Sequence, residues 1–177
     1  SITEEALALA ADQAHIIITS GGVSEGEEDH VKAAVATLGQ LDVWKLAIKP
    51  GKPLAFGRVK QTPFFGLPGN PASVLVTFMV MARPFLLALQ GCTTTQGLSL
   101  NARLLNPPQR PSIRQEYLRV RLVENTQSGI VLEAMTNQNS GVLTTAMKGD
   151  GLAVVKVNTC GAEAQEVEFL PYVVYGV

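Results

Sequence analysis

The chain has 177 residues, of which 46% are hydrophobic and 16% are charged, and its formal net charge is −1. This length and composition suit one or two folded domains with a buried core. The near balance of charge gives no support to a nucleic-acid or anionic-membrane partner, so any anion site must be local. Cys92 and Cys160 match no metal or redox spacing, which favours free thiols in a reducing, cytoplasmic compartment.

The first half of the chain alternates helical and extended patterns, which predicts a largely parallel sheet in an α/β domain. The apolar run over residues 74–82 is short for a membrane span, and Arg83-Pro84 interrupts it. Pro84 is also expected to kink the last helix. The predicted elements are a helix over 4–14, a strand over 15–19, a helix over 27–38, strands over 41–48, 54–59 and 64–67, and a helix from Asn70 towards Leu89.

The second half contains short extended patterns separated by turn signals such as Asn106-Pro-Pro. Alternation of charged and apolar residues is typical of half-buried antiparallel strands. We therefore predict a small all-β domain, a barrel or a sandwich, over residues 97–177, joined by a linker at 91–96 to an α/β domain over 1–91. The predicted strands cover residues 98–105, 116–123, 130–134, 152–157 and 166–169.

Three polar loops are candidates for a functional site, and the first covers residues 20–29. Ser24 and Glu27 fit a helix capping box, and the glycines of this loop allow another group to approach the backbone. The helix dipole favours acidic residues in the first turn of a helix, which explains part of the negative charge here. The alternative is that one or two of them bind a hard cation such as Mg²⁺, which bridges to a phosphate or an oxyanion. The four carboxylates belong to Glu25, Glu27, Glu28 and Asp29.

The second loop carries Lys45, Lys49 and Lys52 around a Pro50-Gly51 turn. Solvated surface charge is the usual fate of lysine. If Lys45 and Lys49 share a strand, their side chains point to the same face, because side-chain direction repeats every second residue. A stiff turn between Lys49 and Lys52 suits the binding of phosphate or another oxyanion.

The third loop, Gly66-Leu-Pro-Gly-Asn-Pro71, connects a predicted strand to a helix. Asn70 is favoured as N-cap and Pro71 at the first helical position, so a well-made helix start explains the motif by itself. Gly69 also allows a ligand to approach the backbone. Loops that follow parallel strands share one edge of the sheet, where ligands bind. Together the three loops indicate an α/β protein that handles a phosphate or an oxyanion.

The three motifs, in this order, resemble the molybdopterin molybdenumtransferase family, which includes MoeA and the E domain of gephyrin. The matching strings are Thr19-Ser-Gly-Gly-Val-Ser-x-Gly-Glu-x-Asp29, Trp44-Lys-Leu-Ala-Ile-Lys-Pro-Gly-Lys-Pro53 and Gly66-Leu-Pro-Gly-Asn-Pro71. The segments 114–122 and 139–143 resemble the C-terminal β domain of that family. The resemblance implies part of a parallel three-layer α/β domain followed by a small β domain.

The resemblance also implies an activity and a set of site residues. Family members insert molybdate into adenylylated molybdopterin, use Mg²⁺ and release AMP. Asp29, Lys45 and Lys49 are then expected in the active site, with Asp29 and Glu27 as metal ligands. Arg114 and Arg119 could reach a ligand, although we expect them at the surface. The implied substrate-binding residues are Ser20, Gly21, Gly22, Ser24, Lys52, Gly66, Pro68, Gly69, Asn70 and Pro71.

The family has a long N-terminal part with no counterpart in these residues, so we expect the chain to be an inactive fragment of a larger enzyme. The resemblance implies a cytoplasmic homodimer for the full-length protein, with molybdopterin adenylyltransferase as its functional partner. Two alternatives remain at this point. One is a scaffold that binds partner peptides, as in gephyrin, and the other is a protein that binds molybdopterin without further chemistry.

Overall fold

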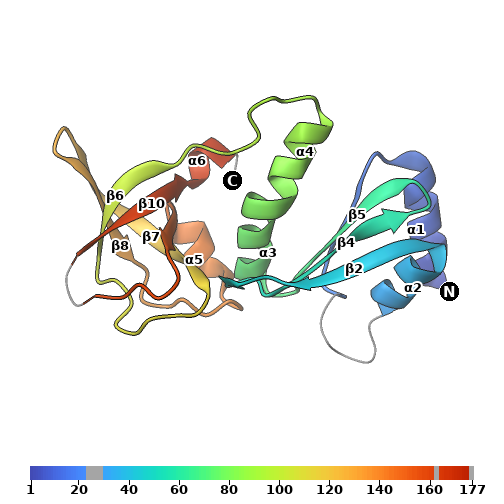
Figure 1. Ribbon diagram of the computed structural model, residues 1–177, viewed down its shortest axis with the longest axis horizontal. Helices are drawn as coiled ribbons and strands as arrows, with labels where there is room; N and C mark the ends of the chain where they lie inside the picture. The colour runs from blue at the N-terminus through green and yellow to red at the C-terminus, as the bar shows by residue number, and fades with distance from the viewer. Residues whose placement is uncertain (23–29, 162–163, 176–177) are drawn as a thin grey trace.

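A computed structural model describes residues 1–22, 30–161 and 164–175 of the chain. An α/β part lies at one end of an elongated molecule and a β-barrel at the other, with a long helix between them (Figure 1). The two parts correspond to the two sequence patterns. The α/β class followed by an all-β unit is therefore confirmed.

The α/β part contains a four-stranded sheet in the order β1-β5-β4-β2. Its helix α1 begins after Ser1, whose side chain and that of Glu4 form a capping box. The strands and helices of this part agree with the sequence patterns to within a few residues. They are α1 (Ile2–Gln13), β1 (Ile17–Ser20), α2 (His30–Leu38), β2 (Gly39–Lys45), β4 (Pro53–Val59) and β5 (Thr62–Leu67).

The sheet is mixed rather than largely parallel. Strand β1 pairs with β5 in parallel, but β5 with β4 and β4 with β2 pair antiparallel. A largely parallel sheet was predicted, but no helix separates β2, β4 and β5 in the sequence. Strands joined by short turns pair antiparallel, because a parallel pairing needs a long crossover connection.

The sheet is covered on both faces, so this part has three layers. Alternation in β5 sends Phe64 to the cluster formed with α1 and α2, and Phe65 to the cluster on the opposite face. The second cluster includes Ala82 and Phe85 of the long helix, and Phe65 and Phe85 have their ring centroids 5.1 Å apart. Burial of aromatic rings on both faces explains why this strand is apolar throughout.

The long helix comprises α3 (Pro71–Thr77), a π-helical turn η1 (Phe78–Ala82) and α4 (Arg83–Leu89). The π-helical turn ends one residue before the Arg83-Pro84 pair, and the kink expected at Pro84 stays a prediction. By length and composition alone the helix could cross a membrane, since its mean hydropathy is 1.9 over 19 residues. Packing accounts for part of this apolar character, since Val76 and Met79 are buried against the barrel.

The second part is a closed barrel of five strands, β7-β8-β6-β10-β9, in which β9 also pairs with β7. Closure leaves these five strands without free edges. The expected strands are all present, and two short helices, α5 (Leu143–Lys148) and α6 (Tyr172–Tyr175), were not predicted. The strands are β6 (Leu100–Leu105), β7 (Gln115–Thr126), β8 (Gly129–Ala134), β9 (Gly151–Val155) and β10 (Gln165–Pro171).

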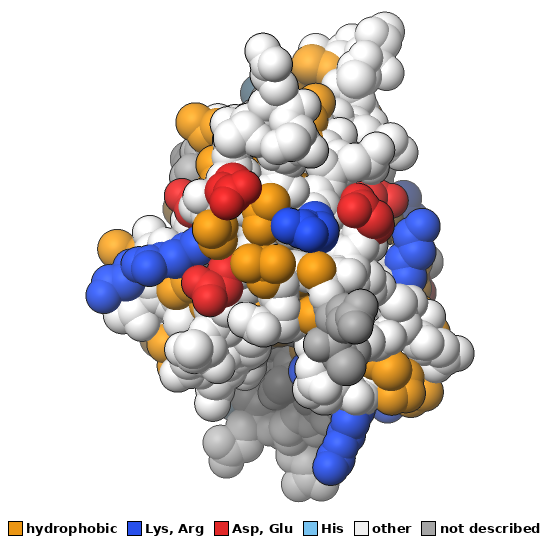
Figure 2. Space-filling view, turned by 90° about the vertical axis from the view of Figure 1, so that its left-hand side faces the viewer, with side chains coloured by type: hydrophobic (Ala, Val, Ile, Leu, Met, Phe, Trp, Pro, Cys, Tyr) orange, Lys and Arg blue, Asp and Glu red, His pale blue; other side chains and the backbone are white. Residues whose placement is uncertain are grey.

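The barrel end of the molecule carries acidic and basic side chains side by side, with apolar side chains between them (Figure 2). A single-sign basic surface of the kind that binds nucleic acid is not seen in this view. This agrees with the near-neutral net charge of the sequence.

Candidate functional site

The chain between β2 and β4 connects the sheet to the barrel. Strand β2 ends at Lys45, and a separate short strand, β3 (Ile48–Lys49), pairs in parallel with β7 of the barrel. The single strand predicted over residues 41–48 is therefore wrong at its C-terminal end. Lys45 and Lys49 belong to different sheets, so the argument that they share one strand face does not hold.

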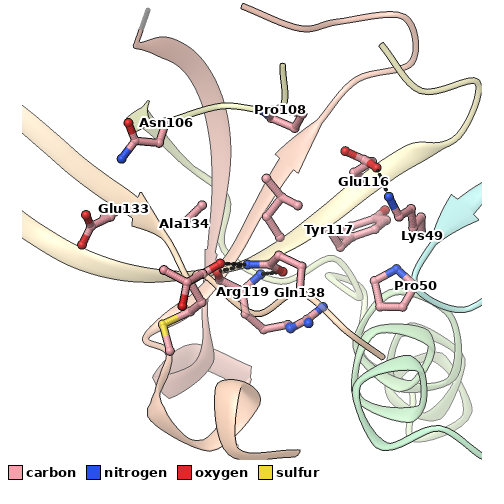
Figure 3. A pocket seen from close by; sticks show the side chains of 13 residues that line it. Lys49, Pro50, Asn106, Pro108, Glu116, Tyr117, Arg119, Glu133, Ala134 and Gln138 are labelled. Carbon is pink, nitrogen blue, oxygen red and sulfur yellow. Dashed lines mark hydrogen bonds and ion pairs between the residues drawn. The ribbon is translucent and has the colours of Figure 1, made fainter. Parts of the chain in front are cut away.

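Lys49 is held by a carboxylate of the barrel. Its Nζ donates to Oε1 of Glu116 over 2.7 Å, and the Glu116 side chain is 7% exposed whereas that of Lys49 is 55% exposed. The two residues also face each other in the β3–β7 register (Figure 3). A buried carboxylate of this kind requires a cationic partner, so Glu116 fixes where the Lys49 ammonium group lies.

The Pro50-Gly51 turn is buried and rests against α3. Gly51 has a φ of +108°, and a Cβ built on it would lie 2.6 Å from Cγ2 of Thr77. Glycine is needed here both for the backbone conformation and for the close approach to the helix. The turn thereby holds Lys49 and Lys52 beside α3.

The first and third loops meet at one edge of the sheet, as expected for loops that follow the parallel pair β1 and β5. Gly21 donates its N–H to the carbonyl of Leu67 over 3.0 Å, and a Cβ built on Gly69 would lie 3.6 Å from Cα of Gly21. Gly21 and Gly22 have φ of +85° and +69°, a region that favours glycine. Both positions therefore adopt a backbone conformation that other residues rarely reach.

The start of α3 is capped by the barrel rather than by its own N-cap side chain. Asn70 occupies the N-cap position without capping, and its Nδ2 donates instead to Oγ of Ser140 over 3.1 Å. The Ala72 N–H donates to the Ser140 carbonyl over 3.0 Å. One of the free N–H groups of the helix start is therefore satisfied by the barrel.

These elements enclose a cavity of about 420 Å³ between the sheet, α3 and the barrel. Its cationic side chains are Lys49, Lys52 and Arg114, and among the described residues that line it none carries a carboxylate. The side chains of Asn70, Ser73 and Ser140 add neutral hydrogen-bonding groups. We call this space the cationic cavity. The residues that line it are Lys49, Pro50, Gly51, Lys52, Pro53, Asn70, Ser73, Arg114, Gln138, Asn139 and Ser140.

The cationic cavity is suited to a small oxyanion. Lysine supplies compact ammonium donors, and arginine supplies a planar fork that matches two oxygens of one anion. Arg114 donates weakly to the carbonyl of Ile48, at 3.5 Å, which holds its guanidinium beside the turn. Because the net charge of the chain is close to zero, this gathering of cations is local, as the sequence required.

A second cavity of about 420 Å³ lies on the barrel side of Lys49 and shares Lys49, Pro50 and Gln138 with the first. Figure 3 shows Glu116 and Glu133 among its lining residues, from strands β7 and β8. Carboxylates beside a cavity disfavour an anion. The two cavities therefore differ in charge, and Lys49 with its partner Glu116 separates them.

The structure brings part of the predicted site together. Lys49, Lys52 and Asn70 line the cationic cavity, whereas Lys45 lies exposed at the end of β2. Ser20, Gly21, Gly22 and Gly69 lie at the neighbouring sheet edge, and Gly66, Pro68 and Pro71 form the strand end and helix start behind it. The predictions for Asp29, Glu27 and Ser24 fall outside the described residues.

Other residues of the cavity were missed or misplaced by sequence reasoning. Arg114 was expected at the surface but lines the cavity, and Arg119 was also expected there but is 1% exposed. Ser73, Gln138 and Ser140 carried no chemical motif. The available signals were the segments 114–122 and 139–143, which resemble the β domain of the family and contain Arg114 and Ser140.

Mg²⁺ binding is not tested by the described part of the chain. Among residues 1–22, 30–161 and 164–175, no group of three or more His, Cys, Asp or Glu side chains could hold a metal ion. Asp29 and Glu27, the predicted ligands, lie in the part that is not described.

Comparisons with known proteins agree with this architecture. The family described as "Probable molybdopterin binding domain" matches residues 1–88, and the family described as "MoeA C-terminal region (domain IV)" matches residues 101–172. The chain belongs to the MoeA family. The first family model thus covers the α/β part and the long helix, and the second covers most of the barrel.

Individual relatives show the same relationship. A molybdopterin molybdenumtransferase of Haemophilus influenzae is 53% identical over 88 residues, which cover 50% of this chain and 22% of that protein. The molybdenum cofactor synthesis protein cinnamon of Drosophila melanogaster is 35% identical over 162 residues, which cover 89% of this chain and 26% of that protein.

A solved structure of the molybdopterin biosynthesis MoeA protein from Pyrococcus horikosii superposes with a TM-score of 0.74 at 29% identity. The match covers 96% of this chain and 40% of that one. The chain therefore spans between 22% and 40% of the length of these three MoeA relatives.

Proposed function

We propose that the protein containing this chain is a molybdopterin molybdenumtransferase, which inserts molybdate into adenylylated molybdopterin and releases AMP. The observation that carries this proposal is the cationic cavity, where Lys49, Lys52 and Arg114 gather with no carboxylate among the described lining residues. Molybdate is a tetrahedral dianion, and two or three fixed cations with neutral donors suit it. Relatives that carry the same enzyme name support the assignment.

In this proposal the residues of the cavity bind and orient molybdate as a substrate. Lys49, Lys52 and Arg114 offset its charge, while Ser73 and Ser140 donate hydrogen bonds that fix its orientation. Because these donors are already held in place, little reorganisation is needed when the dithiolene sulfurs of molybdopterin reach the molybdenum atom. The contribution of this chain is therefore placement of the oxyanion.

We place the phosphate region of the substrate at the adjoining sheet edge. Gly21 contacts Gly69 there, and Asn70 leads directly from this edge into the cationic cavity. Ser20, Gly22, Ser24, Gly66, Pro68 and Pro71 are proposed to shape the same region. Lys45 keeps its proposed active-site role from the motif it belongs to.

Mg²⁺ is part of the proposal on the strength of the sequence pattern. Carboxylate oxygens are the usual protein ligands of Mg²⁺, and we propose Asp29 and Glu27 for this role. A cytoplasmic homodimer and a functional link to molybdopterin adenylyltransferase complete the proposal and rest on the family resemblance.

The function can be tested by molybdate-dependent AMP release in the full-length protein. We expect Arg114→Gln and Lys52→Gln each to lower the rate at limiting molybdate by about tenfold or more, since each removes a charge-assisted contact. Lys60→Gln is the matched control, because Lys60 pairs with Asp12 on the far side of the sheet. Unchanged rates in both cavity variants would refute the assignment.

The same assay tests whether the 177-residue chain is sufficient. The chain spans less than half of each relative compared above, and we expect it to release no AMP by itself. A rate equal to that of the full-length protein would overturn this expectation. Peptide capture without binding of adenylylated molybdopterin by the full-length protein would favour the scaffold alternative instead.

A further inference from the structure

Arg119 of β7 is the largest fully buried side chain among the described residues, at 1% exposed. Within the described part of the chain it forms no ion pair, and its Nε has no hydrogen-bond partner. Burial lowers the pKa of its guanidinium, and the nearby Tyr172 opposes this shift. A buried cation without a carboxylate partner is costly and calls for an explanation.

Arg119 makes hydrogen bonds to the segment 135–139 with both its side chain and its backbone. Its Nη2 donates to the carbonyls of Asn139, at 3.1 Å, and Asn137, at 3.4 Å. Its backbone N–H donates to Oε1 of Gln138, and its carbonyl accepts from Nε2 of Gln138 and from the Met135 N–H. Figure 3 shows Gln138 lying directly beside Arg119. One residue thus holds this segment by both its side chain and its backbone.

The end of the held segment forms a wall of the cationic cavity. Gln138, Asn139 and Ser140 all line it. Ser140 also accepts the Ala72 N–H and the Asn70 side-chain amide, so it joins the barrel to the start of α3. Displacement of this segment would move one wall of the cavity and release the cap of the helix.

We propose that Arg119 is a positioning residue for the oxyanion site, which it serves by holding the segment 137–140 against α3. The proposal rests on the proposed function for its ligand, molybdate. It explains why a charged donor is buried here: a guanidinium forms stronger bonds to carbonyls than a neutral group does.

A double-mutant cycle on molybdate binding by the 177-residue chain tests this role. We expect Arg119→Met to weaken binding about tenfold or more, and Arg119→Lys, which keeps a charged donor, to weaken it less. In a Ser140→Ala background the effect of Arg119→Met should shrink to about twofold, because both changes act through one segment. In an Arg114→Gln background it should remain in full, since Arg114 contacts the turn instead.

Arg121→Met is the matched control, because Arg121 lies exposed on the same strand. We expect it to bind molybdate as the unmodified chain does. Equal molybdate affinity of the Arg119→Met and unmodified chains, or an undiminished effect in the Ser140→Ala background, would overturn the proposal. If Arg119→Met does not fold, Arg119→Lys carries the same cycle, with a partial loss expected.

Amide hydrogen exchange separates this proposal from the proposed function. We expect Arg119→Met, but not Arg121→Met, to speed exchange of the Ala72 N–H by about tenfold, because its acceptor on Ser140 is no longer held. If the unmodified chain binds no molybdate, the proposed function fails while this measurement still decides whether Arg119 holds the segment. Unchanged exchange at Ala72 would show that it does not.

Discussion

At the scale of single residues, the pair of Lys49 and Glu116 sets the charge of the cationic cavity. Glu116 is buried and faces the second cavity, while Lys49 lines both. We expect Lys49→Gln to weaken molybdate binding about tenfold, because it removes a cation and leaves the buried carboxylate unpaired near the anion. Glu116→Gln should strengthen binding severalfold, since glutamine still accepts from Lys49 without neutralising it. Calorimetric titration measures both, and equal effects of the two variants in the same direction would contradict this account.

Tyr172 provides a second prediction at this scale, on stability against pH. Burial raises the pKa of Tyr172 well above its ordinary value of 10.0, and the charge of Arg119 opposes the shift only in part. Above pH 10 the unfolded chain therefore loses a proton that the folded chain keeps, so the free energy of unfolding falls as pH rises. The slope approaches about 1.4 kcal/mol per pH unit for one such group. Urea unfolding between neutral and alkaline pH measures it.

Tyr172→Phe is the matched variant for this effect. The Tyr172 hydroxyl is buried without a hydrogen-bond partner among the described residues, so its removal should not destabilise the fold at neutral pH. The alkaline slope should become shallower without vanishing, because burial also raises the pKa of Tyr117. A slope equal to that of the unmodified chain would rule out Tyr172 as its source.

At the scale of elements, the Pro50-Gly51 turn joins β3 to the start of β4 and presses on α3. Gly51→Ala should lower the free energy of unfolding for two reasons. Its φ of +108° is strained for alanine, and the added Cβ would lie 2.6 Å from Cγ2 of Thr77. Gly91→Ala tests the effect of positive φ alone, because Gly91 has a φ of +81° and open space around it. We expect a loss of about 1 kcal/mol for Gly91→Ala and a larger one for Gly51→Ala, which alone weakens molybdate binding. Similar losses in urea unfolding would show that the contact with α3 is unimportant.

The elements were predictable where local pattern decides them. The extended pattern over 130–134 after the Ser128-Gly turn signal, and the helix start at Asn70-Pro71, led to β8 and to the start of α3 within a residue or two. The pattern could not show that residues 41–48 split between two sheets, because the partner of Ile48 and Lys49 is β7, far along the chain. Pairing of this kind depends on tertiary contacts rather than on local propensity.

At the scale of the whole molecule, the cationic cavity exists because the barrel docks on the sheet and α3. Lys49, Lys52 and Asn70 were accessible to sequence reasoning, since each belongs to a loop with turn chemistry and charge. Arg114 and Ser140 were not, because their place in the site depends on how β3 and α3 meet the barrel. The site is therefore a property of two domains together, and neither domain alone encloses it.

Direct titration of molybdate into the 177-residue chain tests the central claim most simply. The account predicts binding that weakens about tenfold or more in Arg114→Gln and in Lys52→Gln, and that is unchanged in Lys60→Gln. Because the interaction is charge-driven, affinity should also fall as ionic strength rises. No binding by the unmodified chain, or equal binding by all three variants, would contradict the assignment of the cationic cavity as the oxyanion site.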